Sequence, residues 1–156
     1  HPQGNFRQAP GARHPVCEPD TENFMPETLK HADVTGKIIG CAFQVHSALG
    51  SGFQEVIYQR ALAIEFGLAH LSFAREIEQN IYYRSITEPI GTRRADFIVA
   101  GSVLVEIKAV VVIEPVHVAQ LLNYLRAYGF EVGLLLNFGS KSLTFKRLVL
   151  QQAPHR

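Results

Sequence analysis

The sequence predicts an α/β fold in which helices pack against a mixed β-sheet. Three observations support this class. Apolar residues recur at threes and fours from 33 to 49 and again from 53 to 66, which is typical of amphipathic helices. Short β-branched and aromatic runs follow, and one further helical pattern, 115–128, stands between such runs. The order helix, helix, three strands, helix, two strands is that of a mixed sheet with covering helices.

The composition indicates one globular domain. The chain has 156 residues, 47% of them hydrophobic, which is enough to bury a core. Its formal net charge of +1 argues against a strongly electrostatic, histone-like way of binding nucleic acid, although a local basic patch remains compatible. The cysteines, Cys17 and Cys41, have neither metal-ligand spacing nor a disulfide framework. With no signal-peptide pattern and no apolar run near the roughly 20 residues that span a bilayer, we expect a cytoplasmic protein without a membrane partner.

The first 32 residues are expected to form a flexible tail. They hold five of the eight prolines, which block helix and ladder alike, and few apolar residues. The folded domain is then expected at 33–150, with a short C-terminal tail at 151–156. The sequence begins with His1 rather than Met, which is compatible with a trimmed start.

Each element has its own signals. The first helix is expected to stop at Gly50 and Gly52, and the second, with Val56, Leu62 and Phe66 toward the core, at Gly67. The later helix has Pro115 in its first turn and Gly129 at its C-cap. The expected strands are 73–84, the two halves of a hairpin in 93–109, the apolar run 130–138 and an outer strand at 142–150.

The hairpin carries charge where a sheet core is expected. Ala100-Gly101-Ser102 forms its turn, and Asp96, Glu106 and Lys108 interrupt its apolar runs. Strand alternation puts Glu106 and Lys108 on one face, and Asp96 can lie across from Glu106, although the sequence does not fix the register.

Two explanations fit these charges, since an unpaired buried ion costs several kcal/mol. One is a structural ion pair in which Lys108 neutralises an acid. The other is a site for Mg²⁺ or Mn²⁺, with Asp96 and Glu106 as oxygen ligands and Lys108 facing the substrate, a constellation suited to phosphodiester hydrolysis.

Two helices carry further polar groups. Glu55 and Tyr58 lie three apart, on neighbouring positions of one face, and Glu55 also fits as a first-turn acid that complements the helix dipole. His117, Gln120 and Tyr124 share a face of the later helix, where the alternative is an ordinary solvated stripe.

Together these residues resemble the PD-(D/E)XK nuclease superfamily. More narrowly, Gly52-Phe-Gln-Glu55-Val-Ile-Tyr58 is similar to the signature of the GxxExxY protein family within it. The resemblance covers about residues 34–149. Its other motifs are Val45-His46-Ser-Ala-Leu49-Gly50, Arg94-Ala-Asp96-Phe, Val105-Glu106-Ile-Lys108-Ala109, His117-Val-Ala-Gln120-Leu-Leu-Asn-Tyr124-Leu and Gly133-Leu-Leu-Leu-Asn137-Phe138-Gly139.

The resemblance implies a PD-(D/E)XK nuclease-like core and a role for each matching residue. Asp96 and Glu106 would be metal ligands for Mg²⁺ or Mn²⁺, Lys108 the catalytic lysine, Glu55 an acid that assists the metal or its water, and Gln120 an orienting group. The positions that match with less defined, supporting or substrate-facing roles are His46, Tyr58, His117 and Tyr124. Ala95 stands where the superfamily name has proline, a change expected to affect strand geometry alone.

Two functions follow as expectations. The first is a metal-dependent, endonuclease-like hydrolase, with DNA favoured over RNA. The alternative is a catalytically silent nuclease-fold module that binds nucleic acid or a protein partner. Flanking basic residues are candidate phosphate contacts, Arg93 and Arg94 first among them. A homodimer is compatible with either function, though no sequence feature fixes an interface.

Overall fold

The computed structural model describes residues 31–151, and within them the predicted order of elements is confirmed. The helices and strands are α1 (Ala32–Leu49), α2 (Glu55–Leu68), β1 (Phe73–Ile81), β2 (Gly91–Val99), β3 (Val103–Lys108), α3 (Pro115–Tyr128), β4 (Val132–Asn137) and β5 (Thr144–Val149). The tail expected before residue 31 and the last five residues, 152–156, lie outside the described range.

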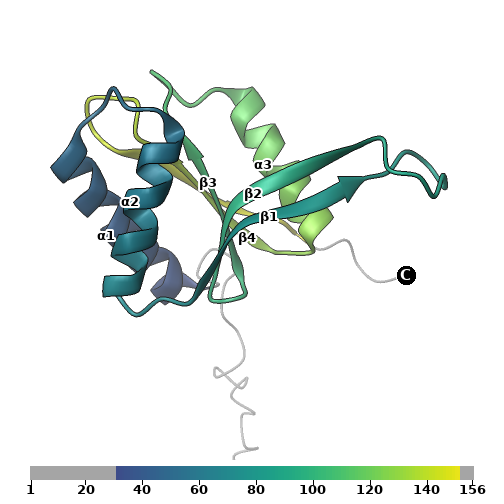
Figure 1. Cartoon of the computed structure of the whole chain (residues 1–156), viewed down its shortest axis with the longest axis horizontal. Helices are drawn as coiled ribbons and strands as arrows, with labels where there is room; N and C mark the ends of the chain where they lie inside the picture. Colours follow the sequence, from purple (N-terminus) through teal and green to yellow (C-terminus); the bar gives the residue numbers. More distant parts are fainter. Residues whose placement is uncertain (1–30, 152–156) are drawn as a thin grey trace, which may run out of the picture.

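The strands form a mixed five-stranded sheet in the order β1-β2-β3-β4-β5. Its neighbours are antiparallel except β3 and β4, which run parallel because α3 carries the chain back between them. Helices α1 and α2 cover one face of the sheet and α3 covers the other (Figure 1). The α/β class expected from the sequence is therefore the observed one.

Each face of the sheet has its own hydrophobic cluster. Under α1 and α2, Val103, Val105 and Ile107 of β3 pack with apolar residues of both helices. Under α3, Leu104 packs with Leu121 and other residues of that helix. The two-residue alternation predicted for β3 is thus what divides the core.

Helix α2 buries Leu62 and Phe66 as predicted, but it differs from the prediction at Val56 and at its end. Its buried stripe is Tyr58, Leu62 and Phe66, whereas Val56 is 39% exposed. The tyrosine ring stacks on Phe138 with centroids 4.7 Å apart, which turns this face of the helix toward the sheet. The predicted stop at Gly67 is wrong, because that residue is helical and the helix continues to Leu68.

Strands β1 and β2 form an arm that extends beyond the other strands. Their pairing runs from Phe73↔Val99 to Ile81↔Gly91, whereas β2 pairs with β3 only from Val99↔Val103 to Phe97↔Val105. Figure 1 shows this arm projecting from the body, with residues 82–90 at its tip. Strand β1 ends at Ile81, three residues before the predicted end, so Tyr82 and Tyr83 belong to the tip. Within residues 31–151, no helix is long and apolar enough to cross a bilayer.

Candidate functional site

Two carboxyl groups lie where β2 and β3 separate. Beyond the last ladder pair, Phe97↔Val105, side chains take over the backbone hydrogen bonds. The Ile107 N–H donates to Asp96 Oδ2 at 2.8 Å, and the Asp96 N–H donates to Glu106 Oε1 at 3.3 Å. The expected proximity of Asp96 and Glu106 is therefore present, because each carboxyl group bonds the backbone of the other strand.

Asp96 reaches this place from the α2 face of the sheet. Ala95 belongs to the cluster under α3, whereas Phe97 and Val99 belong to the cluster under α1 and α2. Residues two apart in a regular strand share a face, so the alternation of β2 is broken at Asp96. The neighbouring strand is irregular at the same point, since Glu76 has a left-handed φ of 49° and is skipped in the ladder between Arg75↔Phe97 and Ile77↔Ala95.

A buried glutamine of α2 holds Asp96 from this side. Gln59 is only 5% exposed, and its Nε2 donates to Asp96 Oδ1 at 3.0 Å. Arg75 Nη2 in turn donates to Gln59 Oε1 at 3.2 Å. Each Asp96 oxygen thus accepts a hydrogen bond, and the arginine fixes which end of the amide faces the carboxylate.

The side chain of Lys108 faces α3. Lys108 Nζ donates to Gln120 Oε1 at 2.9 Å, and Gln120 Nε2 donates to the Tyr124 hydroxyl at 3.5 Å. The Arg93 guanidinium lies over the Tyr124 ring, 5.9 Å from its centroid. The predicted polar face of α3 therefore meets the hairpin charge through Gln120, and Lys108 is hydrogen-bonded to an amide rather than to an acid.

Burial favours the protonated form of both acids, and the Asp96 carboxylate adds to this effect at Glu106. Glu106 is 6% exposed, and burial together with the neighbouring Asp96 carboxylate raises the pKa of Glu106 to about 9. Burial also raises the pKa of Asp96, against the opposing effects of the Ile107 N–H, the Glu106 and Gln59 hydrogen bonds and the Lys108 charge. At neutral pH the metal-free site thus holds a protonated Glu106.

This donor set suits a hard divalent cation. Mg²⁺ is commonly held by one or two carboxylates, with water and substrate phosphate completing its shell. Asp96 and Glu106 supply two such carboxyl groups, and a cation between them would offset the repulsion that raises the pKa of Glu106. Among residues 31–151 there is no group of three or more His, Cys, Asp or Glu side chains placed to hold a metal. A cation here would have the carboxylates of Asp96 and Glu106 as its nearest protein ligands, with water and substrate oxygens completing the shell.

Glu55 opens onto the same region as Asp96. It lies in the first turn of α2 and lines a cavity of about 630 Å³ with Gln59, Glu76 and Asp96. The i, i+4 spacing from Glu55 to Gln59 puts both residues on the same face of α2. The cavity gives solvent access to Asp96 from the α2 side.

Three of the four residues with predicted supporting roles, Tyr58, His46 and His117, bond to backbone groups of loops or of a helix start. The buried Tyr58 hydroxyl donates to the Gly50 carbonyl at 2.6 Å and accepts from the Phe53 N–H at 3.2 Å, so its burial excludes contact with substrate. His46 Nε2 bonds the Ser140 carbonyl at 3.0 Å, which ties α1 to the β4–β5 loop. His117 Nδ1 accepts from the Glu114 N–H at 2.9 Å at the start of α3.

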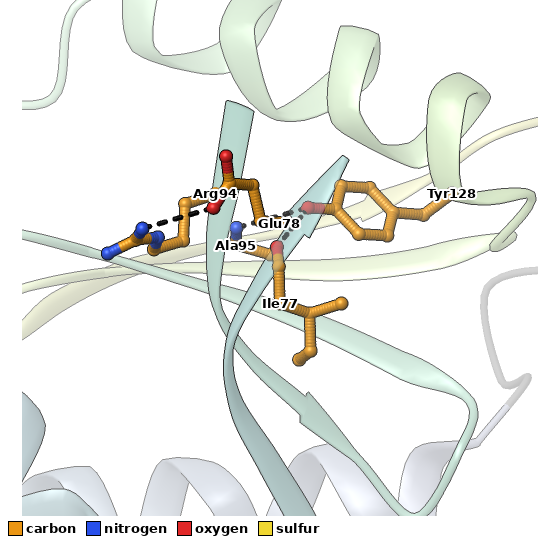
Figure 2. Close-up of polar contacts among 5 residues, drawn as sticks. All are labelled: Ile77, Glu78, Arg94, Ala95 and Tyr128. Atoms are coloured by element: carbon orange, nitrogen blue, oxygen red, sulfur yellow. Dashed lines mark hydrogen bonds and ion pairs between the residues drawn. The ribbon is translucent and has the colours of Figure 1, made fainter. Parts of the chain in front are cut away.

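The two candidate phosphate-contacting arginines of β2 point to different sides. Arg93 faces α3, whereas Arg94 pairs with Glu78 of β1, with 3.2 Å between its Nη2 and Glu78 Oε2 (Figure 2). Both side chains of the Arg94–Glu78 pair are exposed to solvent.

Tyr128 inserts its hydroxyl into the ladder next to Asp96. Figure 2 shows the phenol of Tyr128 reaching from α3 to the paired residues Ile77 and Ala95. The Ala95 N–H donates to this hydroxyl at 3.2 Å, and the hydroxyl donates to the Ile77 carbonyl. The tyrosine thus bridges β1 and β2 where the alternation of β2 breaks.

Three residues that support the site were missed from the sequence. Gln59 and Tyr128 each lie four residues after a predicted site residue, Glu55 and Tyr124, and that helical spacing was the available signal. Asn137 is fully buried; its Oδ1 accepts from the Val110 N–H and the Gly139 N–H, both at 3.0 Å. Its position in an apolar strand gave no comparable sign.

The fold and the site define an α/β domain in which two acids and a lysine lie where the strands of the β2–β3 hairpin separate. The family profile of the PD-(D/E)XK nuclease superfamily matches residues 32–148. The chain belongs to the PD-(D/E)XK nuclease superfamily.

Comparison with solved structures and curated proteins adds little to this assignment. The crystal structure of SSO0001 is similar to this chain with a TM-score of 0.46 and 19% sequence identity, over 82% of this chain and 63% of that one. The chain therefore spans less than two thirds of the length of that protein. Among curated proteins, no match was found.

Proposed function

We propose that the protein is a divalent-metal-dependent nuclease that hydrolyses phosphodiester bonds, with DNA favoured over RNA. The observation that carries this proposal is the meeting of Asp96, Glu106 and Lys108 at the point where β2 and β3 separate, with Gln120 on the lysine. Membership of a nuclease superfamily supports a nucleic-acid substrate. Mg²⁺ or Mn²⁺ is the proposed cofactor, because its preferred ligands are carboxylate oxygens.

Each residue has a proposed part in the reaction. Asp96 and Glu106 are the metal ligands, and the bound ion would polarise a phosphoryl oxygen and lower the pKa of a coordinated water. Lys108 stabilises the negative charge that develops on the phosphate. Gln120 accepts one of the three ammonium hydrogen bonds, which leaves the others for substrate and fixes the direction of Nζ.

Glu55 is the proposed accessory acid. Its place on the cavity that leads to Asp96 supports a role toward the metal or its water. The narrower resemblance to the GxxExxY family stays a prediction, based on Gly52, Glu55 and Tyr58. In this proposal Tyr58 supports the loop before Glu55 through its hydrogen bonds to Gly50 and Phe53.

The second candidate function is a catalytically silent module that binds nucleic acid or a protein. Specific observations favour it. Both oxygens of Asp96 already accept protein hydrogen bonds, from Gln59 and from the backbone of Ile107. Burial also raises the pKa of Glu106 to about 9, so a cation must displace a proton to bind there near neutral pH.

The test is cleavage of a panel of DNA and RNA substrates with Mg²⁺ or Mn²⁺. Asp96→Asn and Lys108→Met are expected to lower the rate by on the order of 100-fold, because each removes a charge from the reaction centre. Lys37→Met is the matched control, since Lys37 is exposed on α1. Equal cleavage by both site variants and the wild type would defeat the proposal. Binding of nucleic acid without metal-dependent cleavage would support the silent module.

A homodimer would place two such sites on the two strands of a duplex. This assembly stays a prediction, and light scattering of the purified protein tests it.

A further inference from the structure

A groove runs from the candidate site along α3 and the β1–β2 arm. Its first part, about 760 Å³, is lined by residues of both, among them Gln120, Tyr124, Arg93 and Arg126. Gln120 accepts a hydrogen bond from Lys108, so one end of the groove is lined by the direct partner of the candidate catalytic lysine.

The groove continues toward the tip of the arm. A second cavity shares Arg93 and Ala127 with the first and is also lined by Asn80 and Tyr82. Asn80 Nδ2 donates to the Tyr82 hydroxyl at 3.5 Å. The shared residues join the two cavities into one path from Gln120 to Tyr82, which we call the α3 groove.

The charge of the α3 groove suits an anion. No acidic side chain lines its first part, whereas Arg93 and Arg126 both do. Glu78 lines the second part, but its carboxylate is paired with Arg94 at 3.2 Å. The groove thus presents guanidinium groups without an opposing free carboxylate along its first part.

One nitrogen of the Arg93 side chain lacks a hydrogen-bond partner among the described residues. Its Nε is buried and has no hydrogen-bond partner among residues 31–151. Its guanidinium is oriented by the ring of Tyr124 rather than by an acid. Because its guanidinium group is not paired with an acid, Arg93 can pair with a phosphate oxygen in the groove.

The far end of the groove offers an aromatic surface. Tyr82 is 54% exposed, and the neighbouring Tyr83 is 52% exposed with Arg84 over its ring. Aromatic rings stack on bases whose faces are free, as in a single strand, whereas in a duplex the stacked neighbours cover those faces. Arginine for phosphate and tyrosine for base is the pairing used by single-strand binding surfaces.

We propose that the α3 groove binds single-stranded nucleic acid and leads that strand to Lys108. Arg93 and Arg126 contact consecutive phosphates, and Tyr82 stacks on a base at the tip of the arm. The inference rests on the proposed function and narrows its substrate to single strands or to duplexes with unpaired tails.

The test measures binding without cleavage. Fluorescence anisotropy is recorded in EDTA with a labelled thymidine oligonucleotide, a duplex of the same length and a single-stranded RNA. The wild type is expected to bind the single strands about tenfold more tightly than the duplex, and the two single strands distinguish a DNA site from an RNA site.

Matched variants locate the binding surface. Arg126→Ala is expected to weaken single-strand binding about fivefold and to lower the slope of log affinity against log salt by about 0.7, because one phosphate contact is lost. Arg60→Ala, on the exposed side of α2, is expected to change neither. Tyr82→Leu is expected to cost about tenfold, whereas Tyr82→Phe keeps the ring and the affinity.

Several results would overturn the α3 groove as a single-strand site: tighter binding of the duplex, equal losses in Arg126→Ala and Arg60→Ala, or displacement of the oligonucleotide by an acidic peptide at equal charge concentration. The outcome is separable from that of the proposed function. Binding that depends on Arg126 and Tyr82 but never leads to metal-dependent cleavage would reject the nuclease and keep the groove. Cleavage with unchanged binding in those variants would reject the groove alone.

Discussion

Replacing Glu106 with glutamine is expected to stabilise the metal-free protein at alkaline pH. Burial and the Asp96 carboxylate raise the pKa of Glu106 from 4.5 to about 9. Between these values the folded protein holds a proton that the unfolded chain has released, so the free energy of unfolding falls as pH rises. Glutamine keeps the shape of the protonated acid and cannot ionise.

The magnitude follows from the proton difference. One proton bound only by the folded state changes stability by up to about 1.4 kcal/mol per pH unit, or about 2–3 kcal/mol from about pH 6 to about pH 8. For a domain of this size the loss corresponds to roughly 10 °C in melting temperature. Glu106→Gln is expected to lose most of this dependence and to melt above the wild type at the higher pH.

The assay is thermal unfolding in EDTA at both pH values, followed by circular dichroism. Glu88→Gln, at an exposed position in the tip of the arm, controls for the loss of one negative charge. If wild type and Glu106→Gln show the same pH dependence, Glu106 is not the protonated buried acid described above. Added Mn²⁺ at the higher pH is expected to raise the melting temperature of the wild type and to leave that of Glu106→Gln unchanged, because the variant lacks a ligand.

Three further substitutions test the scaffold of the site by thermal or urea unfolding. Tyr128→Phe removes the hydroxyl between Ala95 and Ile77 and is expected to cost about 1–2 kcal/mol of stability. The Tyr124 hydroxyl accepts only one long bond, from Gln120, so Tyr124→Phe is expected to cost less. Equal costs would contradict the bridging role of Tyr128. Gln59→Leu leaves Arg75 and one Asp96 oxygen without their partner and is expected to cost about 1–3 kcal/mol, so an unchanged stability would contradict the buried relay. Gly139→Ala places a methyl group against the backbone of Ala109 and Val110 and is expected to cost about 3 kcal/mol of stability. Gly133→Ala meets only leucine side chains at 3.2 Å and is expected to cost less. The reverse order would contradict this packing.

The sequence was informative about the site where the elements are regular. Helical spacing placed Gln120 and Tyr124 on one face of α3, and strand alternation placed Glu106 and Lys108 on one face of β3; in the structure Lys108 bonds to Gln120. Both predictions needed only the period of one element. The turn at Ala100-Gly101-Ser102 was also predicted, from a glycine between two apolar runs, and Gly101 has a φ of +63°.

The prediction was incomplete where side chains replace backbone bonds. Ala95 N–H bonds to Tyr128, and Asp96 N–H bonds to Glu106, so side chains accept from two successive backbone N–H groups of β2. A strand interrupted in this way no longer follows a two-residue period. Gln59 was not assigned to Asp96, because a regular hairpin puts Asp96 across from Glu106 on the polar face, whereas Asp96 bonds to Gln59 of α2.

Helix α2 gives a second case in which contacts across the fold decided the outcome. Its sequence offers several apolar stripes, and the stacking of Tyr58 on Phe138 selects one of them. That contact joins residues 80 positions apart in the sequence. No local pattern in either segment indicates it.

Anomalous diffraction from a crystal soaked in Mn²⁺ tests the central claim most directly. We expect one peak between the carboxyl groups of Asp96 and Glu106, about 2.2 Å from an oxygen of each, with Lys108 Nζ still on Gln120. The same soak of Asp96→Asn is expected to show no peak there. A wild-type crystal with manganese bound elsewhere, or with the Asp96–Gln59 and Asp96–Ile107 bonds intact and no metal between the acids, would contradict the proposed metal centre.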